Sequence, residues 1–212
     1  MEKLSLPEIV ESHGKGNMKK NLPFDRPDEE TLKTRYAVNK WAKSGVPDRH
    51  KLLVPTGPEG WLEARKTLLE TFGDGAIGVL TGKRGTGKTQ LGVSLIRSFC
   101  WGGYCASYEK AIDIFLTIRE GMHENGERKV IQKYLDVDFL VIDAMEERGE
   151  TPFEDRMLNY ILDRRYDALQ DTLLITNQTK ERFAESAGAS IISRIHESGV
   201  VLDCDWKSFR EG

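Results

Sequence analysis

A run of eight residues, Gly82 to Thr89, has the spacing of a phosphate-binding loop, GxxxxGKT. It directly follows the apolar run AIGVLT (76–81) and precedes a stretch of helical character, QLGVSLIRSF. Glycines let backbone amides turn inward around phosphate oxygens, at the start of a helix whose dipole favours an anion. In such a loop Lys88 reaches the terminal phosphates and the hydroxyl of Thr89 binds Mg²⁺. The residues predicted to contact a nucleoside triphosphate are Gly82, Lys83, Arg84, Gly85, Thr86, Gly87, Lys88, Thr89 and Gln90.

A loop of this kind needs an acid that holds the metal ion, usually at the end of a neighbouring buried strand. Asp143 ends the apolar run FLVID (139–143) and meets this requirement. The alternative is that Asp143 only caps a following helix. The sequence therefore predicts a Mg²⁺ site formed by Thr89 and Asp143, and Asp143 is also a candidate catalytic residue.

The residue after Asp143 departs from the pattern of fast ATPases. AAA+ ATPases usually have a glutamate there, which orients the attacking water, whereas this chain has Ala144. Glu146 and Glu147 follow closely, and either could replace the missing acid only if the loop bends back. We therefore expect a site that binds ATP and hydrolyses it slowly.

Asn177 is a third candidate catalytic residue. It follows the apolar run TLLIT (172–176), and ligands bind at the carboxyl ends of the strands in open α/β sheets. An amide at this edge can hold the attacking water or the γ-phosphate. The alternative is that Asn177 caps the helix expected over KERFAESAG.

Arg194 lies in ASIISRIHESG (189–199), where the isoleucines share one face of a predicted helix and the arginine falls outside that face. It is therefore expected at the surface. One interpretation is a solvated cation favoured by the end of the helix. The other is a cation that acts on the ATP of a neighbouring subunit, where a planar guanidinium stabilises the transferring phosphoryl group.

The elements that position these residues follow the pattern of a parallel sheet. Apolar runs that do not alternate, such as FLVI and LLI, are typical of strands buried on both faces, and the stretches between them indicate helical crossovers. The five runs are 76–81, 104–108, 139–143, 172–176 and 200–203. The sequence thus predicts a three-layer α/β fold of the P-loop NTPase class with about five parallel strands.

The first 53 residues have a different character. They carry 11 Lys or Arg against 8 Asp or Glu, whereas the rest of the chain is net acidic. We predict a helical partner-binding segment, 1–53, and an ATP-binding domain, 54–212. Pro27 and the acids that follow it suit the start of a helix and Gly45 suits its end, so one helix is expected over roughly 28–44. Its narrow apolar stripe must dock, either on its own chain or on a partner.

Composition argues against several classes of protein. With 31 basic and 34 acidic residues the net charge is −3, so any contact with DNA must be local. The three cysteines form no CxxC pair and the four histidines have no metal-ligand spacing, which argues against a disulfide scaffold or a zinc site. The sequence shows neither a membrane helix nor a signal peptide, so a cytoplasmic protein without a membrane partner is expected.

Together these motifs resemble the bacterial DnaC helicase loaders, their phage counterparts and the related IstB transposition helpers. The resemblance runs from about Gly45 to Arg210. The stretches that carry it are GVPDRH (45–50), GKRGTGKTQL, DFLVID, ILDRRYDALQDTLLITNQTKERF and SRIHESGVVLDCDWKSFR.

The resemblance implies an AAA+ core without the usual C-terminal lid, with ATP or ADP and Mg²⁺ as cofactors. It implies the role of sensor I for Asn177, of arginine finger for Arg194 and of sensor II for Arg210. It also implies self-association into a spiral or ring that holds a DnaB-type replicative helicase and assists its placement on single-stranded DNA. The helicase would be held through residues 1–53, which are fewer than the loaders' usual N-terminal domain.

In this family the region between the second and third strands carries the element that contacts DNA. Here it supplies cations and an aromatic residue, the groups that follow a backbone and stack on bases. They are Tyr108, Lys110, Arg119, Arg128, Lys129 and Lys133. Two other functions stay open: an IstB-type helper that remodels duplex DNA for a transposase or recombinase, and a small-molecule P-loop kinase. The kinase is disfavoured because we find no arginine-rich lid segment.

Overall fold

The structure is a computed structural model that describes residues 29–52, 57–123, 126–207 and 209. Its centre is one sheet of five strands in the order β2-β3-β4-β1-β5, and all neighbouring strands are parallel. The strands are β1 (Ile77–Thr81), β2 (Ala106–Lys110), β3 (Phe139–Asp143), β4 (Asp171–Ile175) and β5 (Val200–Asp203). The predicted fold class is therefore confirmed.

Strand β2 begins two residues later than predicted. The sequence favours 104–108, but Tyr104 and Cys105 are exposed and the strand starts at Ala106. Because β2 is an edge strand, only some of its side chains are buried, and polar Glu109 and Lys110 complete it. An apolar run is a weaker guide to the ends of an edge strand than to those of a central one.

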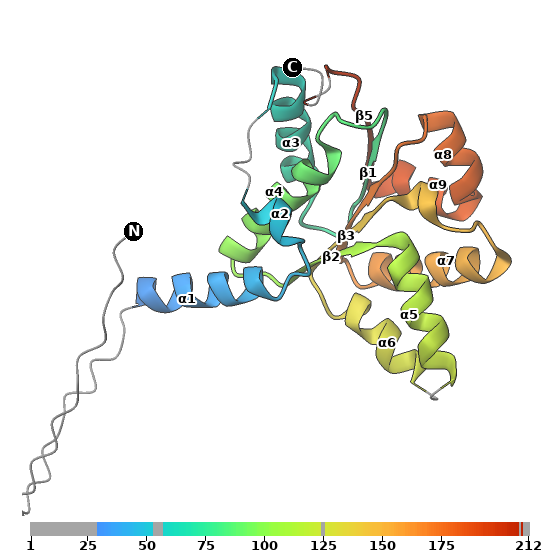
Figure 1. The fold of residues 1–212 in the computed structure, drawn as a ribbon, viewed down its shortest axis with the longest axis horizontal. Helices are drawn as coiled ribbons and strands as arrows, with labels where there is room; N and C mark the ends of the chain where they lie inside the picture. The colour runs from blue at the N-terminus through green and yellow to red at the C-terminus, as the bar shows by residue number, and fades with distance from the viewer. Residues whose placement is uncertain (1–28, 53–56, 124–125, 208, 210–212) are drawn as a thin grey trace, which may run out of the picture.

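Helices cover both faces of the sheet (Figure 1). One layer contains α3 and α4, with α1 and α2 packed against α4, and the other contains α5 to α9. The first layer has the bounds α1 (Glu29–Ala42), α2 (Asp48–Lys51), α3 (Glu59–Thr71) and α4 (Lys88–Trp101). The second has α5 (Ala111–His123), α6 (Glu127–Leu135), α7 (Pro152–Asp167), α8 (Lys180–Ala187) and α9 (Ala189–Ser198).

The central strands are buried on both faces and separate two apolar clusters. All five residues of β1, of β3 and of β4 are buried. Successive strand residues point to opposite faces, so in β3 Val141 joins the cluster under α3 and α4, whereas Leu140 and Ile142 join the one under α5 to α9. This two-sided burial explains why the strands read as continuous apolar runs.

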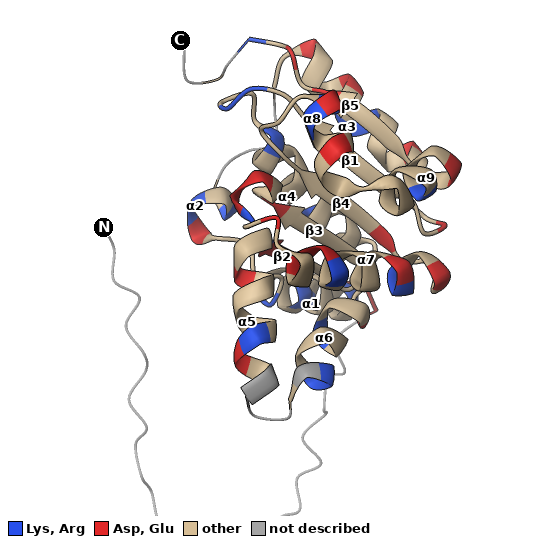
Figure 2. Cartoon of the chain, turned by 90° about the vertical axis from the view of Figure 1, so that its right-hand side faces the viewer, with Lys and Arg blue, Asp and Glu red and all other residues tan. Residues whose placement is uncertain are grey.

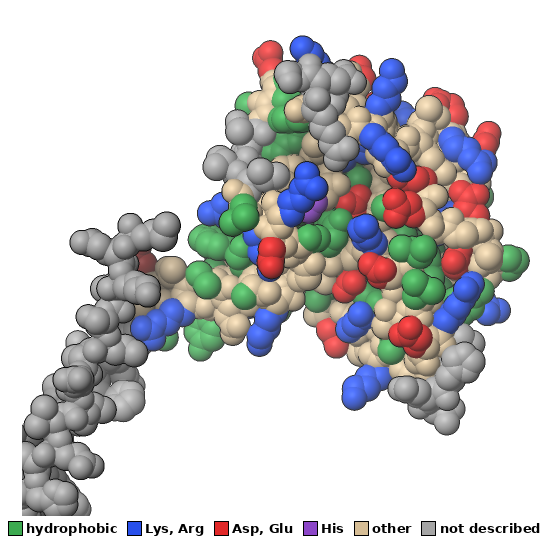
Figure 3. Space-filling model, viewed as in Figure 1, with side chains coloured by type: hydrophobic (Ala, Val, Ile, Leu, Met, Phe, Trp, Pro, Cys, Tyr) green, Lys and Arg blue, Asp and Glu red, His purple; other side chains and the backbone are tan. Residues whose placement is uncertain are grey.

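Helix α1 docks on its own chain through its C-terminal half. Ala37 is buried, and the rings of Trp41 and Trp101 meet edge to face with centroids 6.4 Å apart. Tyr36 and Val38, on either side of Ala37 in the sequence, stay exposed, and the N-terminal part of the helix projects from the domain (Figures 1 and 3). The helix predicted over 28–44 is thus present over 29–42, and α4 is what it docks on.

Parallel strands bring their carboxyl ends to one edge of the sheet. The segments after β1, β3 and β4 meet there, and they contain the predicted site residues. Near the opposite edge lies Arg165 of α7, which is fully buried. Its guanidinium donates to Thr172 Oγ1 and to the carbonyl oxygens of Tyr134 and Val137, at 2.7 to 2.9 Å, and it also contacts the carbonyl groups of Asp138 and Asp171.

Among the residues that the structure describes, we find no helix with both the length and the apolar character needed to cross a bilayer.

Candidate nucleotide-binding site

The loop after β1 is made of glycines in backbone conformations that other residues rarely adopt. Gly82, Gly85 and Gly87 have φ angles of 111°, 91° and 81°, and Gly87 is the residue before α4 begins. A Cβ atom on Gly82 would lie 2.8 Å from the carbonyl oxygen of Cys204. The loop therefore brings its backbone to the N-terminus of α4, where free amide groups and the helix dipole favour an anion.

The side chain of Lys88 lies inside this loop. Its Nζ donates to the carbonyl oxygens of Gly82 and Lys83 at 2.6 and 2.7 Å, and the residue is buried. Burial lowers the pKa of Lys88, and nearby acidic groups that include Glu146 and Asp143 partly offset this effect. The ammonium group is thus held where oxygens of a bound phosphate can replace the carbonyl oxygens as acceptors.

Three aromatic residues that the sequence analysis missed fix the loop backbone. The Nε1 of Trp61 donates to the carbonyl of Gly87 at 3.1 Å, and the Nε1 of Trp206 donates to the carbonyl of Thr86 at 2.7 Å. The backbone amide of Phe209 donates to the carbonyl of Gly85 at 2.9 Å. Aromatic residues occur in any core, so no sequence signal distinguishes Trp61 and Trp206 from ordinary packing, and Phe209 contacts the loop through its backbone, which its residue type does not reveal.

Thr89 and Asp143, the predicted Mg²⁺ ligands, are in direct contact. Thr89 Oγ1 donates to Asp143 Oδ2 at 2.7 Å, and the amide of Ala144 donates to Oδ1 at the same distance. Asp143 is not a helix cap, because the short 3-10 helix that follows it, η1 (Met145–Glu147), has no side-chain cap.

This donor set fits Mg²⁺. The ion prefers oxygen ligands and is usually bound by one or two protein groups, water and the phosphates of a nucleotide. A hydroxyl and a carboxylate in contact at the phosphate loop supply the protein's share. Within the described part of the chain, no cluster of three His, Cys, Asp or Glu residues could hold a metal ion without a nucleotide.

Tyr108 also contacts the predicted metal site, which the sequence analysis did not foresee. It was a candidate for base stacking, but it is buried and its hydroxyl donates to Asp143 Oδ2 at 2.7 Å. Burial and the neighbouring Asp143 raise the pKa of Tyr108 well above its usual value, so the hydroxyl stays a donor. A buried ring of this kind cannot stack on a nucleic-acid base.

The loop after Asp143 bends back, as a replacement for the missing glutamate requires. Ala144 adopts a left-handed conformation (φ 56°, ψ 46°), and η1 then carries Glu146 to the end of β4. Oε2 of Glu146 accepts from the amide of Asn177 at 3.0 Å and from Thr176 Oγ1 at 3.2 Å, while Oε1 accepts from the side-chain amide of Asn177. The structure thus brings Glu146 and Asn177 together.

Glu146 and Glu147 have different environments. Burial raises the pKa of Glu146, but hydrogen bonds from Asn177 and Thr176 outweigh burial, so its pKa lies below the usual value and the carboxylate is ionised at neutral pH. Glu147 is exposed. Asn177 does not cap α8, because Thr179 is the N-cap and its hydroxyl accepts from the amide of Arg182.

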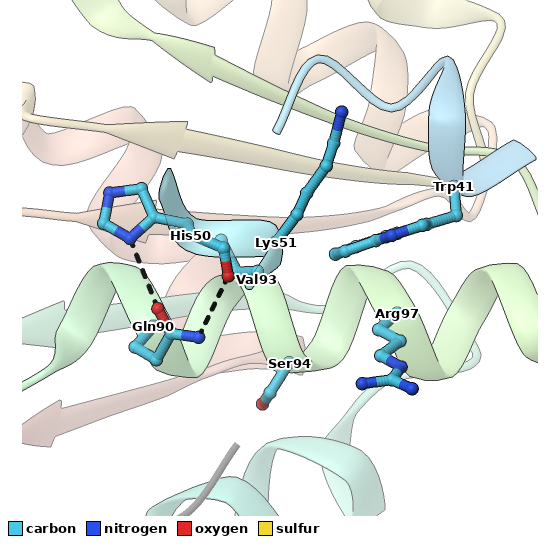
Figure 4. Close-up of a pocket in the computed structure, with 7 residues that line it drawn as sticks. All are labelled: Trp41, His50, Lys51, Gln90, Val93, Ser94 and Arg97. Atoms are coloured by element: carbon cyan, nitrogen blue, oxygen red, sulfur yellow. Dashed lines mark hydrogen bonds between the residues drawn. The ribbon is translucent and has the colours of Figure 1, made fainter. Parts of the chain in front are cut away.

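The side chain of Gln90 faces away from the loop, toward α2 (Figure 4). Its Oε1 lies 3.2 Å from His50 Nδ1, and its Nε2 donates to the carbonyl of His50 at 3.3 Å. The amide of Gln90 therefore joins the stretch GVPDRH to the start of α4, and its predicted contact with nucleotide would have to involve the backbone.

Arg194 is not the freely solvated side chain that the helical pattern predicts. Its side chain is 24% exposed, forms an ion pair with Asp163 of α7 and lies over the ring of Tyr166 at 5.6 Å. It also donates to the carbonyl of Ser190 at 2.9 Å. Helical periodicity located the arginine outside the apolar arc of α9 but could not reveal that α7 covers it. Arg210 and residues 1–28 of the predicted partner-binding segment lie outside the described residues.

A cleft of about 360 Å³ opens beside the phosphate loop. This volume is within the range of small-molecule pockets. The cleft is bounded by the loop itself, by the segment after β4 and by the segment after β5. Its lining includes Lys83, Thr86, Asn177, Lys180, Asp203 and Trp206.

Comparisons with known proteins identify the family and the fold of the chain. The family described as IstB-like ATP binding protein matches residues 72–210. The replicative helicase loader DnaC of Escherichia coli (strain K12) is 26% identical over 151 residues, which are 70% of this chain and 62% of that protein. The chain thus spans less than two thirds of the length of this curated relative.

Two solved structures share the fold. The crystal structure of the DnaC helicase loader covers 77% of this chain and 98% of its own, with a TM-score of 0.62 and 19% identity. The AMPPCP-bound DnaA from Aquifex aeolicus covers 74% of this chain and 52% of its own, with a TM-score of 0.61 and 20% identity. Because the family match extends over more than half of the sequence and includes the loop, Asp143 and Asn177, the chain belongs to the IstB-like ATP binding proteins, and its fold is like those of the DnaC and DnaA structures.

Proposed function

We propose that the chain is an ATP-dependent loader that holds a DnaB-type replicative helicase and assists its placement on single-stranded DNA. The observation that carries the ATP-dependent part is the contact between Thr89 and Asp143 beside the buried ammonium group of Lys88. The DnaC relatives support the choice of a helicase as partner. Nucleotide occupancy would govern how copies of the chain associate.

In this proposal the loop amides and Lys88 bind the phosphates, and Thr89 and Asp143 hold Mg²⁺. The metal ion, when bound, neutralises charge on the phosphate oxygens. Glu146 accepts a proton from the attacking water, in the role that Ala144 cannot fill, and Asn177 orients the Glu146 carboxylate. Because Thr176 and Asn177 already occupy both carboxylate oxygens, we expect slow turnover.

The helicase would be held through residues 1–53, in which α1 is the longer of the two described helices. Leu32 and Tyr36, four residues apart on one face of α1, are large apolar side chains that the helix leaves exposed. An apolar helix face that projects from the domain is a suitable element for insertion into a groove on a partner.

Single-stranded DNA would meet the cations at the end of β2 and on α5 and α6; Figure 2 colours the Lys and Arg positions of the chain. Arg119 stacks on Phe153 and lies 3.9 Å from Glu154, and Lys133 lies 3.8 Å from Glu109. The exposed Lys110, Arg128 and Lys129 are therefore the better candidates for phosphate contacts.

The test of the loader function is to mix the full chain with a purified DnaB-type hexamer, with and without ATP and Mg²⁺, and to measure the masses of the complexes that form. We expect a defined complex whose stoichiometry depends on ATP.

Lys88→Ala is expected to weaken ATP binding by roughly ten- to a hundredfold, because it removes a charge-assisted contact with phosphate. The variant should form the complex only at correspondingly higher ATP.

If the DnaB-type hexamer binds none of this protein, with or without ATP, the loader function is contradicted. The match to the IstB-like family favours the second candidate in that case, a helper that remodels DNA for a transposase or recombinase. Tighter binding of duplex than of single-stranded DNA, with no helicase retained, would support the helper.

We further propose that Arg194 acts on the ATP of a neighbouring copy. Arg194→Ala should leave the ATP affinity of dilute monomer unchanged and lower ATP-dependent assembly or turnover. Asp163→Asn is the matched control, because it breaks the same ion pair and keeps the arginine. Equal defects in both variants would mean that Arg194 only joins α7 to α9, and weaker ATP binding by dilute Arg194→Ala would mean that it acts in its own subunit.

A further inference from the structure

We infer that Tyr108 is a positioning residue of the Mg²⁺ site and that it connects this site to the segment that follows α1. The inference rests on the proposed binding of ATP with Mg²⁺. Tyr108 is at the third position of β2, directly beside Val141 of β3, and its side chain lies in the apolar cluster under α4.

On one side, Tyr108 holds the metal-binding carboxylate. Its hydroxyl and that of Thr89 both donate to Oδ2 of Asp143, each at 2.7 Å. A carboxylate oxygen that accepts two hydrogen bonds from fixed donors cannot rotate away without losing both. Tyr108 therefore keeps Asp143 turned toward Thr89, in the arrangement that a shared Mg²⁺ ion requires.

On the other side, the backbone of Tyr108 contacts the segment that follows α1. The amide of Tyr108 donates to the carbonyl of Ser44 at 2.7 Å. Gly45, with φ 73°, lies so close that a Cβ atom on it would be 2.7 Å from the carbonyl oxygen of Tyr108. Tyr108 thus orients Asp143 through its hydroxyl and is hydrogen bonded through its backbone to the segment that follows α1.

A second contact joins the same segment to the other metal ligand. His50 of α2 is hydrogen bonded to Gln90, which is the residue after Thr89 in α4. Residues 44–50 therefore reach both sides of the Thr89–Asp143 pair. A partner that shifts α1 would move Tyr108 and Gln90, which contact or adjoin the metal ligands. Mg²⁺ binding would in turn favour the position in which residues 44–50 keep these hydrogen bonds.

The first test is Tyr108→Phe, which removes one hydroxyl and keeps the ring. ATP affinity is measured with Mg²⁺ and in its absence, with EDTA, and the ratio of the two is compared with that of the native protein. We expect the variant to lower the Mg²⁺-dependent gain in affinity by roughly tenfold, the effect of one hydrogen bond to a charged group, and to leave the Mg²⁺-free affinity unchanged. A purely structural role would change both affinities or neither.

Tyr134→Phe is the matched control, because Tyr134 is also buried but lies in the other apolar cluster. It should leave the ratio at its native value. Suppose that the native protein binds ATP more tightly with Mg²⁺ and that Tyr108→Phe has the same ratio of the two ATP affinities. That result would overturn this inference and leave the proposed function standing. A native protein that binds no ATP would overturn the proposed function and the inference with it.

The second test is Gly45→Ala, whose Cβ would push the segment away from the Tyr108 carbonyl. We expect a smaller Mg²⁺-dependent gain in the native background and little further loss in the Tyr108→Phe background. Gly188→Ala is the control for backbone strain, since Gly188 has φ 82° and nothing within 4 Å of a Cβ. An effect of Gly45→Ala that is absent, or equal in both backgrounds, would overturn the connection through Tyr108.

Discussion

Replacing Glu146 by Gln is expected to lower ATP turnover by roughly a hundredfold, the lower range for loss of a general base. Glutamine has the size of glutamate and keeps one oxygen that can accept a hydrogen bond from Asn177, but it cannot take a proton from water at neutral pH. ATP affinity should therefore change little. The measurements are steady-state phosphate release and equilibrium nucleotide binding on the same protein.

Glu147→Gln is the control, because Glu147 is next in sequence, has the same chemistry and is exposed. It should keep the native rate. A loss confined to Glu147→Gln would assign the base to that residue. Unchanged turnover in both variants would show that neither carboxylate replaces the acid missing at Ala144. A native rate like that of ordinary AAA+ ATPases would contradict only the expectation of slow hydrolysis.

The strands and the phosphate loop could be predicted because their signals are local. Strands buried on both faces appear as continuous apolar runs, and β3 and β5 have the predicted bounds. The glycines of the loop and the Thr89–Asp143 pair follow from the requirements of a phosphate and a metal ion. Parallel topology then brings the ends of β1, β3 and β4 to one edge without further information.

The position of Glu146 could not be predicted, because it depends on the backbone of a residue that gives no sign of it. Ala144 has φ 56°, a conformation that an alanine seldom adopts. Only this turn lets η1 carry Glu146 back to Asn177 instead of away from the sheet. From the sequence we could say that Glu146 replaces the missing acid only if the loop bends back, but we could not say whether the loop does so.

The contacts of Tyr108 and Arg194 could not be predicted for a different reason: their partners are distant in sequence. In the sequence Tyr108 stands beside the cations that follow it, whereas its partner Asp143 is on the neighbouring strand. Helical periodicity predicted an exposed Arg194, whereas Asp163 of another helix pairs with it. A pattern within one element cannot show which neighbouring element covers a polar side chain.

Arg165 is another residue whose contacts are made with other elements, and it is far from the predicted site. It is the only arginine of its adjacent pair that is buried, since Arg164 is exposed. Burial lowers the pKa of Arg165 to about 10, so the guanidinium remains charged at neutral pH. Its donors satisfy carbonyl groups of α6, of the turn before β3 and of β4, and they join α7 to these three elements.

Arg165→Met is expected to lower the free energy of unfolding by about 3 to 5 kcal/mol, the effect of breaking a buried charged network from one side. Methionine fills much of the volume, but the carbonyl groups of Tyr134, Val137 and Asp171 lose a donor in a place that water reaches poorly. Arg164→Met, the same change one residue earlier on an exposed position, should stay within about 0.5 kcal/mol of the native protein. Urea unfolding followed by circular dichroism measures both. Equal stabilities would mean that water satisfies these carbonyl groups and that Arg165 is dispensable for joining α7 to the sheet.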